Sequence, residues 1–121
     1  MKLYVSHSSA YDFETELYAP LRSVVGESHE MWLPHDDGRV NGSTDAKDRI
    51  RSSDMLIAEV SLPSTGQGIE IGWADDAGIP IICLHKRGSR VSSALMYINA
   101  RMVEYDDADD LVVRIQEVID I

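Results

Sequence analysis

The segment from residue 54 to residue 78 limits the possible folds more than any other part of the chain. An apolar run at residues 55–60 is too short for a helix and is typical of a strand buried on both faces. A loop of serine, proline, threonine and glycine follows, and a helix is predicted over residues 68–77, closed by Gly78. A strand, a Gly/Ser loop and a helix N-terminus in this order form a cradle for anions and sugars in α/β proteins.

The rest of the chain repeats the alternation of strand and helix. Strands are predicted at residues 2–6, 30–33, 55–60, 80–85 and 102–105, and helices at 11–25, 43 or 44 to 53, 68–77, 92–99 and 108–119. Pro20 interrupts the first helix, so we expect a kink or the start of a new turn there. The pattern predicts an α/β fold, flavodoxin-like (Rossmann-type): a three-layer sandwich around a five-stranded parallel sheet of order 2-1-3-4-5. In this order Ser8 and residues 64–70 converge at one crevice.

Composition narrows the class of ligand. The 121 residues fit a single domain spanning 1–121, and a net charge of −10 argues against a nucleic-acid polymer or an anionic membrane as partner. Cys83 is the only cysteine, and no stretch approaches the ~18 apolar residues that span a bilayer. The histidines and acidic residues show no metal-ligand spacing, so we expect no metal and no cofactor. We therefore expect a cytoplasmic protein that binds a small molecule.

Glu70, just beyond the glycines, is the candidate reactive group. A carboxylate aimed into a sugar cradle can attack or stabilise an electrophilic carbon. The alternative is a structural one, because an acidic residue near a helix N-terminus is favoured by the helix dipole. Glu59 is a second carboxylate, but strand alternation turns it to the opposite face from its neighbours. Its expected role is structural, or at most support of sugar hydroxyls.

Several short motifs between residues 54 and 95 occur together in one known family. They are Ala58-Glu-Val-Ser61, Pro63-Ser64, Gly66-x-Gly68, Ile69-Glu-Ile-Gly72, Cys83-Leu84 and Ser93-Ala94-Leu95. With these motifs the chain resembles the nucleoside 2-deoxyribosyltransferase family, including its branch of 2'-deoxynucleoside 5'-phosphate N-hydrolases. The family favours an aromatic residue before the glutamate, where this chain has Ile69.

The resemblance implies an enzyme that hydrolyses the N-glycosidic bond of a nucleoside or nucleoside 5'-monophosphate, or exchanges its base for another, with Glu70 as nucleophile. It implies that Ser8, Ser64, Gly66 and Gly68 contact the substrate, chiefly its 5'-phosphate. It also implies that Ser93 reaches the phosphate of a neighbouring subunit, which predicts a homodimer with shared sites. Tyr11 is a candidate for stacking on the base, or else packs at the start of a helix.

Two departures from the family pattern leave alternatives open. The loop after the first strand carries no arginine, so the phosphate is held by hydroxyls and backbone, with or without His7, or the substrate has none. The family aspartate falls on Ala46, which leaves Asp48, or Asp45, as its replacement or as part of a solvated helix face. These departures favour the alternative of a non-catalytic nucleotide-binding or sensing module. A more distant alternative is a TIR-like enzyme that cleaves the nicotinamide glycosidic bond of NAD.

Overall fold

The computed structural model of the chain describes residues 1–26, 28–34 and 42–119, with side chains described from residue 46 in the last range. Its strands are β1 (Lys2–His7), β2 (Glu30–Trp32), β3 (Met55–Glu59), β4 (Ile81–Lys86) and β5 (Arg101–Tyr105). Its α-helices are α1 (Ala19–Val25), α2 (Gly42–Arg51), α3 (Thr65–Ala77) and α4 (Ala108–Ile119). A π-helical turn, η1 (Glu14–Tyr18), precedes α1, and a 3₁₀ helix, η2 (Ser93–Tyr97), precedes β5.

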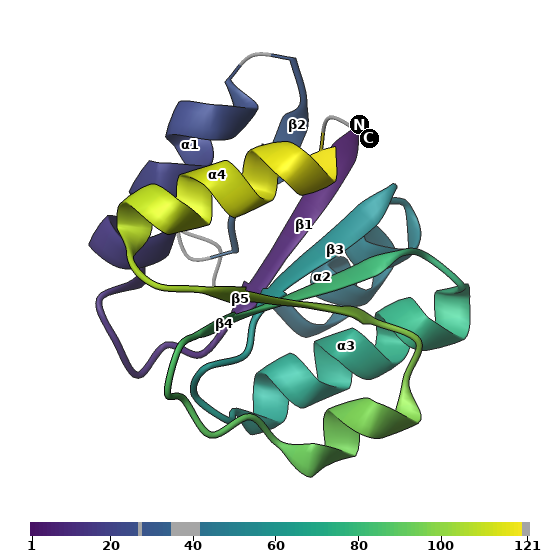
Figure 1. Ribbon diagram of the computed structural model, residues 1–121. Helices are drawn as coiled ribbons and strands as arrows, with labels where there is room; N and C mark the ends of the chain where they lie inside the picture. Colours follow the sequence, from purple (N-terminus) through teal and green to yellow (C-terminus); the bar gives the residue numbers. More distant parts are fainter. Residues whose placement is uncertain (27, 35–41, 120–121) are drawn as a thin grey trace.

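The five strands form one parallel sheet of order β2-β1-β3-β4-β5, as the sequence predicted. Helices α1 and α4 cover one face of this sheet, and α2 and α3 cover the other (Figure 1). The central strands β3 and β4 are buried on both faces because each packs against helices from either side. The predicted three-layer sandwich is therefore confirmed.

Strand alternation decides which residues face which layer. On β1, Leu3 and Val5 pack in the core below α1 and α4, whereas Tyr4 packs in the core below α2 and α3. On β3, Ile57 lies on the α1/α4 side and Ala58 on the α2/α3 side. The same alternation sorts the polar residues at the carboxyl edge of the sheet, where the chemistry is expected.

The first predicted helix is divided in two at the proline. Residues 11 and 12 lie outside any helix. In η1, which is a wide turn, the Ala19 amide donates to the carbonyl oxygen of Glu14, and α1 starts immediately afterwards. Pro20 falls within the first two residues of α1, where its missing N–H costs nothing. The expected new turn at the proline is thus confirmed, and the single helix over 11–25 is not.

Helix α3 begins earlier than predicted. Ser64 caps it, with its hydroxyl accepting from the Gln67 amide at 3.5 Å, so the helix starts at Thr65 rather than at residue 68. Gly66 and Gly68 therefore belong to the first turn of the helix and not to a loop. Gly78 ends the helix with φ +73°, a left-handed conformation that glycine adopts without strain. The predicted helix at 92–99 is shorter and forms the 3₁₀ turn η2.

Candidate active site

Glu70 lies in the second turn of α3 and reaches across to β1. Its Oε2 accepts a hydrogen bond from the Tyr4 hydroxyl at 2.5 Å, and its Oε1 accepts one from the Ser6 hydroxyl at 2.8 Å. Tyr4 and Ser6 are two residues apart on β1, so both side chains point to the α3 side of the sheet. Both oxygens of one carboxylate are therefore held by hydroxyl groups of a single buried strand.

These contacts bear on the structural interpretation of Glu70. The first turn of α3 contains no acidic residue, and Glu70 is the sixth residue of the helix. The dipole effect falls off within the first turn, so it gives little reason for a glutamate at this position. Burial, and then the neighbouring Glu70 carboxylate, raises the pKa of Tyr4 well above its usual value. Tyr4 thus stays protonated and remains a donor to the carboxylate at any ordinary pH.

Gln67 fixes the start of α3 against the sheet. Its side-chain nitrogen donates to the Ser6 carbonyl oxygen at 3.2 Å and to the Glu59 carbonyl oxygen at 2.6 Å. These two carbonyls belong to adjacent parallel strands near their carboxyl ends, and the Gln67 side chain is buried. The amide therefore joins β1, β3 and α3 at one point, one helical turn before Glu70.

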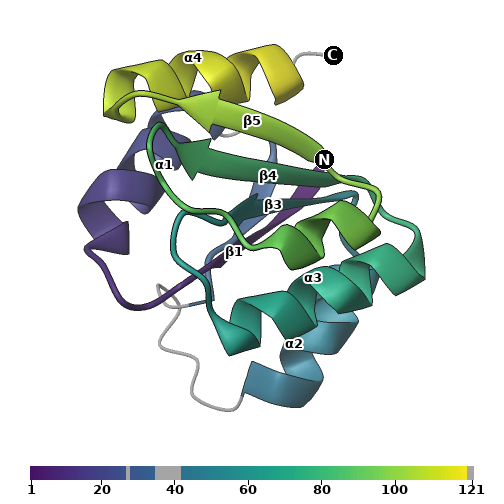
Figure 2. The same ribbon diagram turned by 60° about the horizontal axis from the view of Figure 1, so that its bottom comes forward.

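A cavity of about 350 Å³ lies between the N-terminal part of α3 and the segment that enters η2; we call it the α3 cavity. Figure 2 shows η2 running beside α3. Ser64 and Gly68 line this cavity, as does Ser92 from the η2 side. Gly66 and Ser93 are exposed and are not among its described lining residues, and neither is Glu70. Two of the predicted substrate-binding residues, Ser64 and Gly68, therefore line the α3 cavity.

The predicted site residues of the loop after β1 are not among the described lining residues of the α3 cavity. Ser8 is buried, and its hydroxyl accepts from the Ala10 amide at 3.1 Å, which is a turn interaction. His7 is buried on the α1 side, where its Nδ1 donates to the Ser8 carbonyl oxygen at 2.8 Å and its Nε2 accepts from the Tyr18 hydroxyl at 2.6 Å. Because both ring nitrogens are engaged, His7 offers no free donor to a phosphate. Tyr11 lines a different cavity, beside Tyr105 on the α1/α4 side of the sheet.

The predicted aspartates are on α2. Asp48 is exposed there, and among the described residues it makes no ion pair. Ala46, at the position expected for the family aspartate, packs against the core on the α3 side of the sheet. The side chain of Asp45 lies outside the described residues. The described contacts thus do not bring a second carboxylate to Glu70.

Glu59 is a structural carboxylate, in keeping with the expectation from strand alternation. It is 3% exposed and accepts hydrogen bonds from the Ser61 amide at 2.6 Å, the Ser61 hydroxyl at 3.0 Å and the Tyr105 hydroxyl. Tyr105 packs in the core on the α1/α4 side, so Glu59 lies across the sheet from Glu70. With three donors, its oxygens are committed to holding β3, β5 and the loop after β3 together.

Sequence reasoning missed three residues that hold the site, namely Tyr4, Ser6 and Gln67. The sequence indicated part of this arrangement, because residues two apart on a strand share a face, so Ser6 lies on the same face as Tyr4. The partner of these hydroxyls lies more than sixty residues away along the chain. Among the described residues, no group of three metal-ligating side chains is found, and no helix is long and apolar enough to cross a membrane.

Comparison with known proteins places this carboxylate-bearing α/β domain among nucleotide N-hydrolases. No family model matches the chain. A 2'-deoxynucleoside 5'-phosphate N-hydrolase 1 from Syntrophotalea carbinolica is 39% identical over 95 residues, covering 73% of this chain and 67% of that protein. A 5-hydroxymethyl-dUMP N-hydrolase from Mus musculus is 44% identical over 48 residues, covering 39% of this chain and 28% of that protein. The chain belongs to the 2'-deoxynucleoside 5'-phosphate N-hydrolase family.

Solved structures agree with the fold. The CMP N-glycosidase of Clostridium botulinum superposes with a TM-score of 0.71 at 19% identity, covering both chains completely. A conserved protein of Enterococcus faecalis V583 superposes with a TM-score of 0.68 at 16% identity over 98% of each chain. The family assignment made from the motifs is confirmed, and the family consists of glycosyl hydrolase-type enzymes.

Proposed function

We propose that this protein hydrolyses the N-glycosidic bond of a nucleoside 5'-monophosphate, with Glu70 as the nucleophile. The observation that carries the proposal is the pair of hydroxyls, from Tyr4 and Ser6, that hold the two oxygens of Glu70 beside the carboxyl edge of the sheet. The names of the relatives add support, since they are N-hydrolases of 2'-deoxynucleoside 5'-phosphates and of 5-hydroxymethyl-dUMP. A non-catalytic binding module is not favoured by these relatives.

In the proposed reaction, one Glu70 oxygen bonds to the anomeric carbon as the bond from that carbon to the base nitrogen breaks. Positive charge develops on the sugar ring during this step, and a fixed carboxylate on the opposite face lowers its energy. The base leaves with the bonding electron pair and takes a proton, for which Asp48 on α2 is our candidate donor. Water then attacks the glycosyl ester, which releases the sugar phosphate and restores Glu70.

Two donors position the nucleophile before the substrate arrives. The Tyr4 and Ser6 hydroxyls fix the orientation of the carboxylate, so less reorganisation is needed when charge appears on the sugar. Each oxygen retains further lone pairs, so the hydrogen bonds do not block attack. Gln67 keeps α3 at a constant distance from β1, which keeps the carboxylate in register with the strand.

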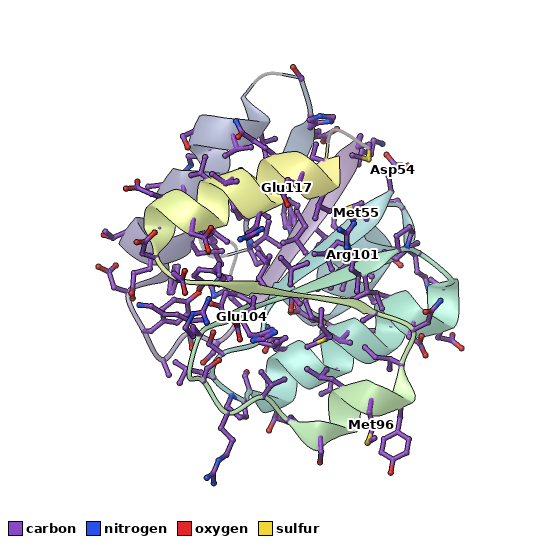
Figure 3. All side chains as sticks on the ribbon, in the orientation of Figure 1. Asp54, Met55, Met96, Arg101, Glu104 and Glu117 are labelled. Atoms are coloured by element: carbon purple, nitrogen blue, oxygen red, sulfur yellow. The ribbon has the colours of Figure 1, made fainter. Side chains whose placement is uncertain are left out.

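We propose that the 5'-phosphate is held by the hydroxyls of Ser8 and Ser64 and by the backbone N–H of Gly66. Gly68, whose own N–H donates to the Ser64 carbonyl oxygen at 3.0 Å, is proposed to contact the substrate through its Cα, since it has no side chain. The capped N-terminus of α3 supports this, because unpaired N–H groups at a helix start favour anions. We further propose a homodimer in which Ser93 from a second copy completes the phosphate site. Met96 and Tyr97 of η2 are 75% and 83% exposed, and Met96 points away from the rest of the molecule (Figure 3). Such exposed apolar side chains are suited to a subunit contact.

The remaining assignments complete the proposal. We propose that residues 1–121 act as one domain in the cytoplasm, and that water, rather than a second base, is the acceptor. Hydrolysis is favoured over transfer because the relatives are named N-hydrolases. Addition of a second free base to the assay tests this choice, because transfer would yield a new nucleotide.

The test measures release of free base by chromatography from a panel of deoxyribonucleoside and ribonucleoside 5'-monophosphates and the matching nucleosides. Glu70→Gln is expected to lower the rate by roughly a thousandfold or more, because the amide is no longer a competent nucleophile. The matched control is Asp76→Asn, the same chemical change at an exposed position on the same helix. Equal rates in wild type and Glu70→Gln, with base released by both, would exclude Glu70 as the nucleophile. No base released by wild type from any compound would exclude the reaction.

A further inference from the structure

A second and larger cavity lies on the other side of the sheet edge. It has a volume of about 600 Å³ and is formed by the carboxyl ends of β3 and β5, the loop after β1 and the turn at residues 86–90; we call it the β5 cavity. Tyr105, one of its walls, packs in the core below α1 and α4, so the cavity lies on the face opposite to Glu70. Its size is within the range of sites that bind small molecules.

Hydrogen bonds hold the Tyr105 wall of the β5 cavity in place. Glu59 accepts hydrogen bonds from Tyr105 and from the amide and hydroxyl of Ser61. The Ser61 hydroxyl in turn accepts from the Lys86 amide at 2.8 Å. These bonds join the ends of β3, β4 and β5, so the position of the Tyr105 ring is fixed in the absence of a ligand. A preformed wall of this kind lowers the entropy cost of binding.

Tyr11 lines the same cavity as Tyr105, and its hydroxyl has no hydrogen-bond partner among the described residues. This hydroxyl is also buried. An unpaired buried hydroxyl is costly to a folded chain, and a ligand with a suitable acceptor would remove that cost. Burial, and then the neighbouring Glu59 carboxylate, raises the pKa of Tyr11 well above its usual value, so the hydroxyl is a donor.

Three cations border the cavity on the side of the turn at residues 86–90. Lys86 pairs with Glu16 at 3.8 Å, and Arg87 pairs with Glu104 and Asp106. Arg90 also lines the cavity, and no carboxylate of the described residues lies within ion-pair distance of it. On a chain of net charge −10, a guanidinium without a carboxylate partner beside a cavity is suited to an anion.

We propose that the β5 cavity is a second ligand site, which binds a planar heteroaromatic anion of the size of a nucleoside monophosphate. The aromatic ring packs against Tyr11 and Tyr105, an acceptor atom on the ring takes the Tyr11 hydrogen bond, and the anionic group pairs with Arg90. Pro63 lines both the β5 cavity and the α3 cavity, and the next residue, Ser64, caps α3. A ligand in the β5 cavity therefore contacts the segment that shapes the proposed active site.

The test is titration calorimetry with CMP, AMP, cytidine and inorganic phosphate, using Glu70→Gln so that no probe is consumed. We expect two nucleotide sites per chain, and we expect Arg90→Gln to weaken one of them at least tenfold. Arg101→Gln is the matched control, because Arg101 starts β5 at the opposite end of the strand from Glu104 (Figure 3). Tyr11→Phe should weaken the same site roughly three- to tenfold without lowering Tm, since the lost hydroxyl has no partner in the free chain.

Two outcomes would overturn the proposal, however many sites are found: Arg90→Gln leaves all nucleotide binding within twofold, or inorganic phosphate binds the Arg90-dependent site as tightly as CMP. The last would mean that the aromatic wall contributes nothing. The result is separate from that for Glu70, because failure of the wild-type protein to release any base would exclude the hydrolase and leave the binding titration valid.

Discussion

Replacing Tyr4 with phenylalanine removes one hydroxyl from the candidate active site and leaves the aromatic ring in place. The Tyr4 side chain is fully buried, so the ring continues to fill its position in the core and no large cavity forms. The main loss is the 2.5 Å hydrogen bond to Oε2 of Glu70, in addition to an interaction of the Tyr4 hydroxyl with the Trp32 side chain. This substitution therefore isolates the contribution of one donor to the orientation of the carboxylate.

The expected magnitude follows from the type of bond. A hydrogen bond to a charged acceptor contributes about 1.5–3 kcal/mol, and each 1.36 kcal/mol of transition-state energy corresponds to about tenfold in rate. If the Tyr4 bond serves to orient the nucleophile, kcat should fall by roughly 10- to 100-fold with little change in KM. Because Glu70 is half-buried and water can replace part of the lost bond, unfolding free energy should fall by only about 1 kcal/mol.

The assay is steady-state base release, combined with thermal denaturation of the same preparations. Tyr18→Phe is the control, because Tyr18 is also fully buried and loses a hydroxyl bond, to His7, on the opposite face of the sheet. We expect Tyr18→Phe to lose similar stability with kcat within twofold of wild type. If Tyr4→Phe and Tyr18→Phe have the same kcat, the hydroxyl at position 4 is structural and the argument for a positioned nucleophile is wrong.

Three further predictions concern stability and pH. Gly78→Ala should lower the free energy of unfolding by about 1 kcal/mol, because alanine is strained at φ +73°. Gly72→Ala, inside α3, should raise the free energy of unfolding by about 0.5 kcal/mol. Thermal denaturation measures both changes, and changes of the same sign would contradict this prediction. Ser64→Ala should lower the free energy of unfolding by about 0.5 kcal/mol, because the cap of α3 is lost. The same substitution should raise KM more than it lowers kcat. An unchanged Tm and an unchanged KM would refute the two effects. Burial raises the pKa of the Cys83 thiol from 9.0 to about 11, so this group's contribution to stability is complete below pH 9 and is lost as pH rises to 11. Denaturation from pH 8 to 11 should therefore show a shallower loss in Cys83→Ala, and parallel curves would exclude the thiol as a contributor.

The sequence alone determined the layers and the order of the sheet. The apolar runs of β3 and β4 have no polar face, so each strand had to be covered on both sides, and alternating helices supply that cover. The motif around Glu70 also gave the family, because its residues are close together in the chain. Ser64 was expected in the loop before this helix, whereas in the structure it caps α3, which starts three residues earlier than expected.

Only the tertiary structure decided how Glu70 is held. Its two donors come from β1, 66 and 64 residues earlier in the chain, and no local pattern specifies which helix residue meets which strand residue. The crossing of α3 over β1 sets that register, through the Gln67 bonds to two strand ends and through packing of the α3 core. The same three-dimensional arrangement places Tyr11 in the wall of the β5 cavity, together with Tyr105. Local periodicity fixes which face a side chain occupies, whereas contacts between distant segments depend on the packing of the whole domain.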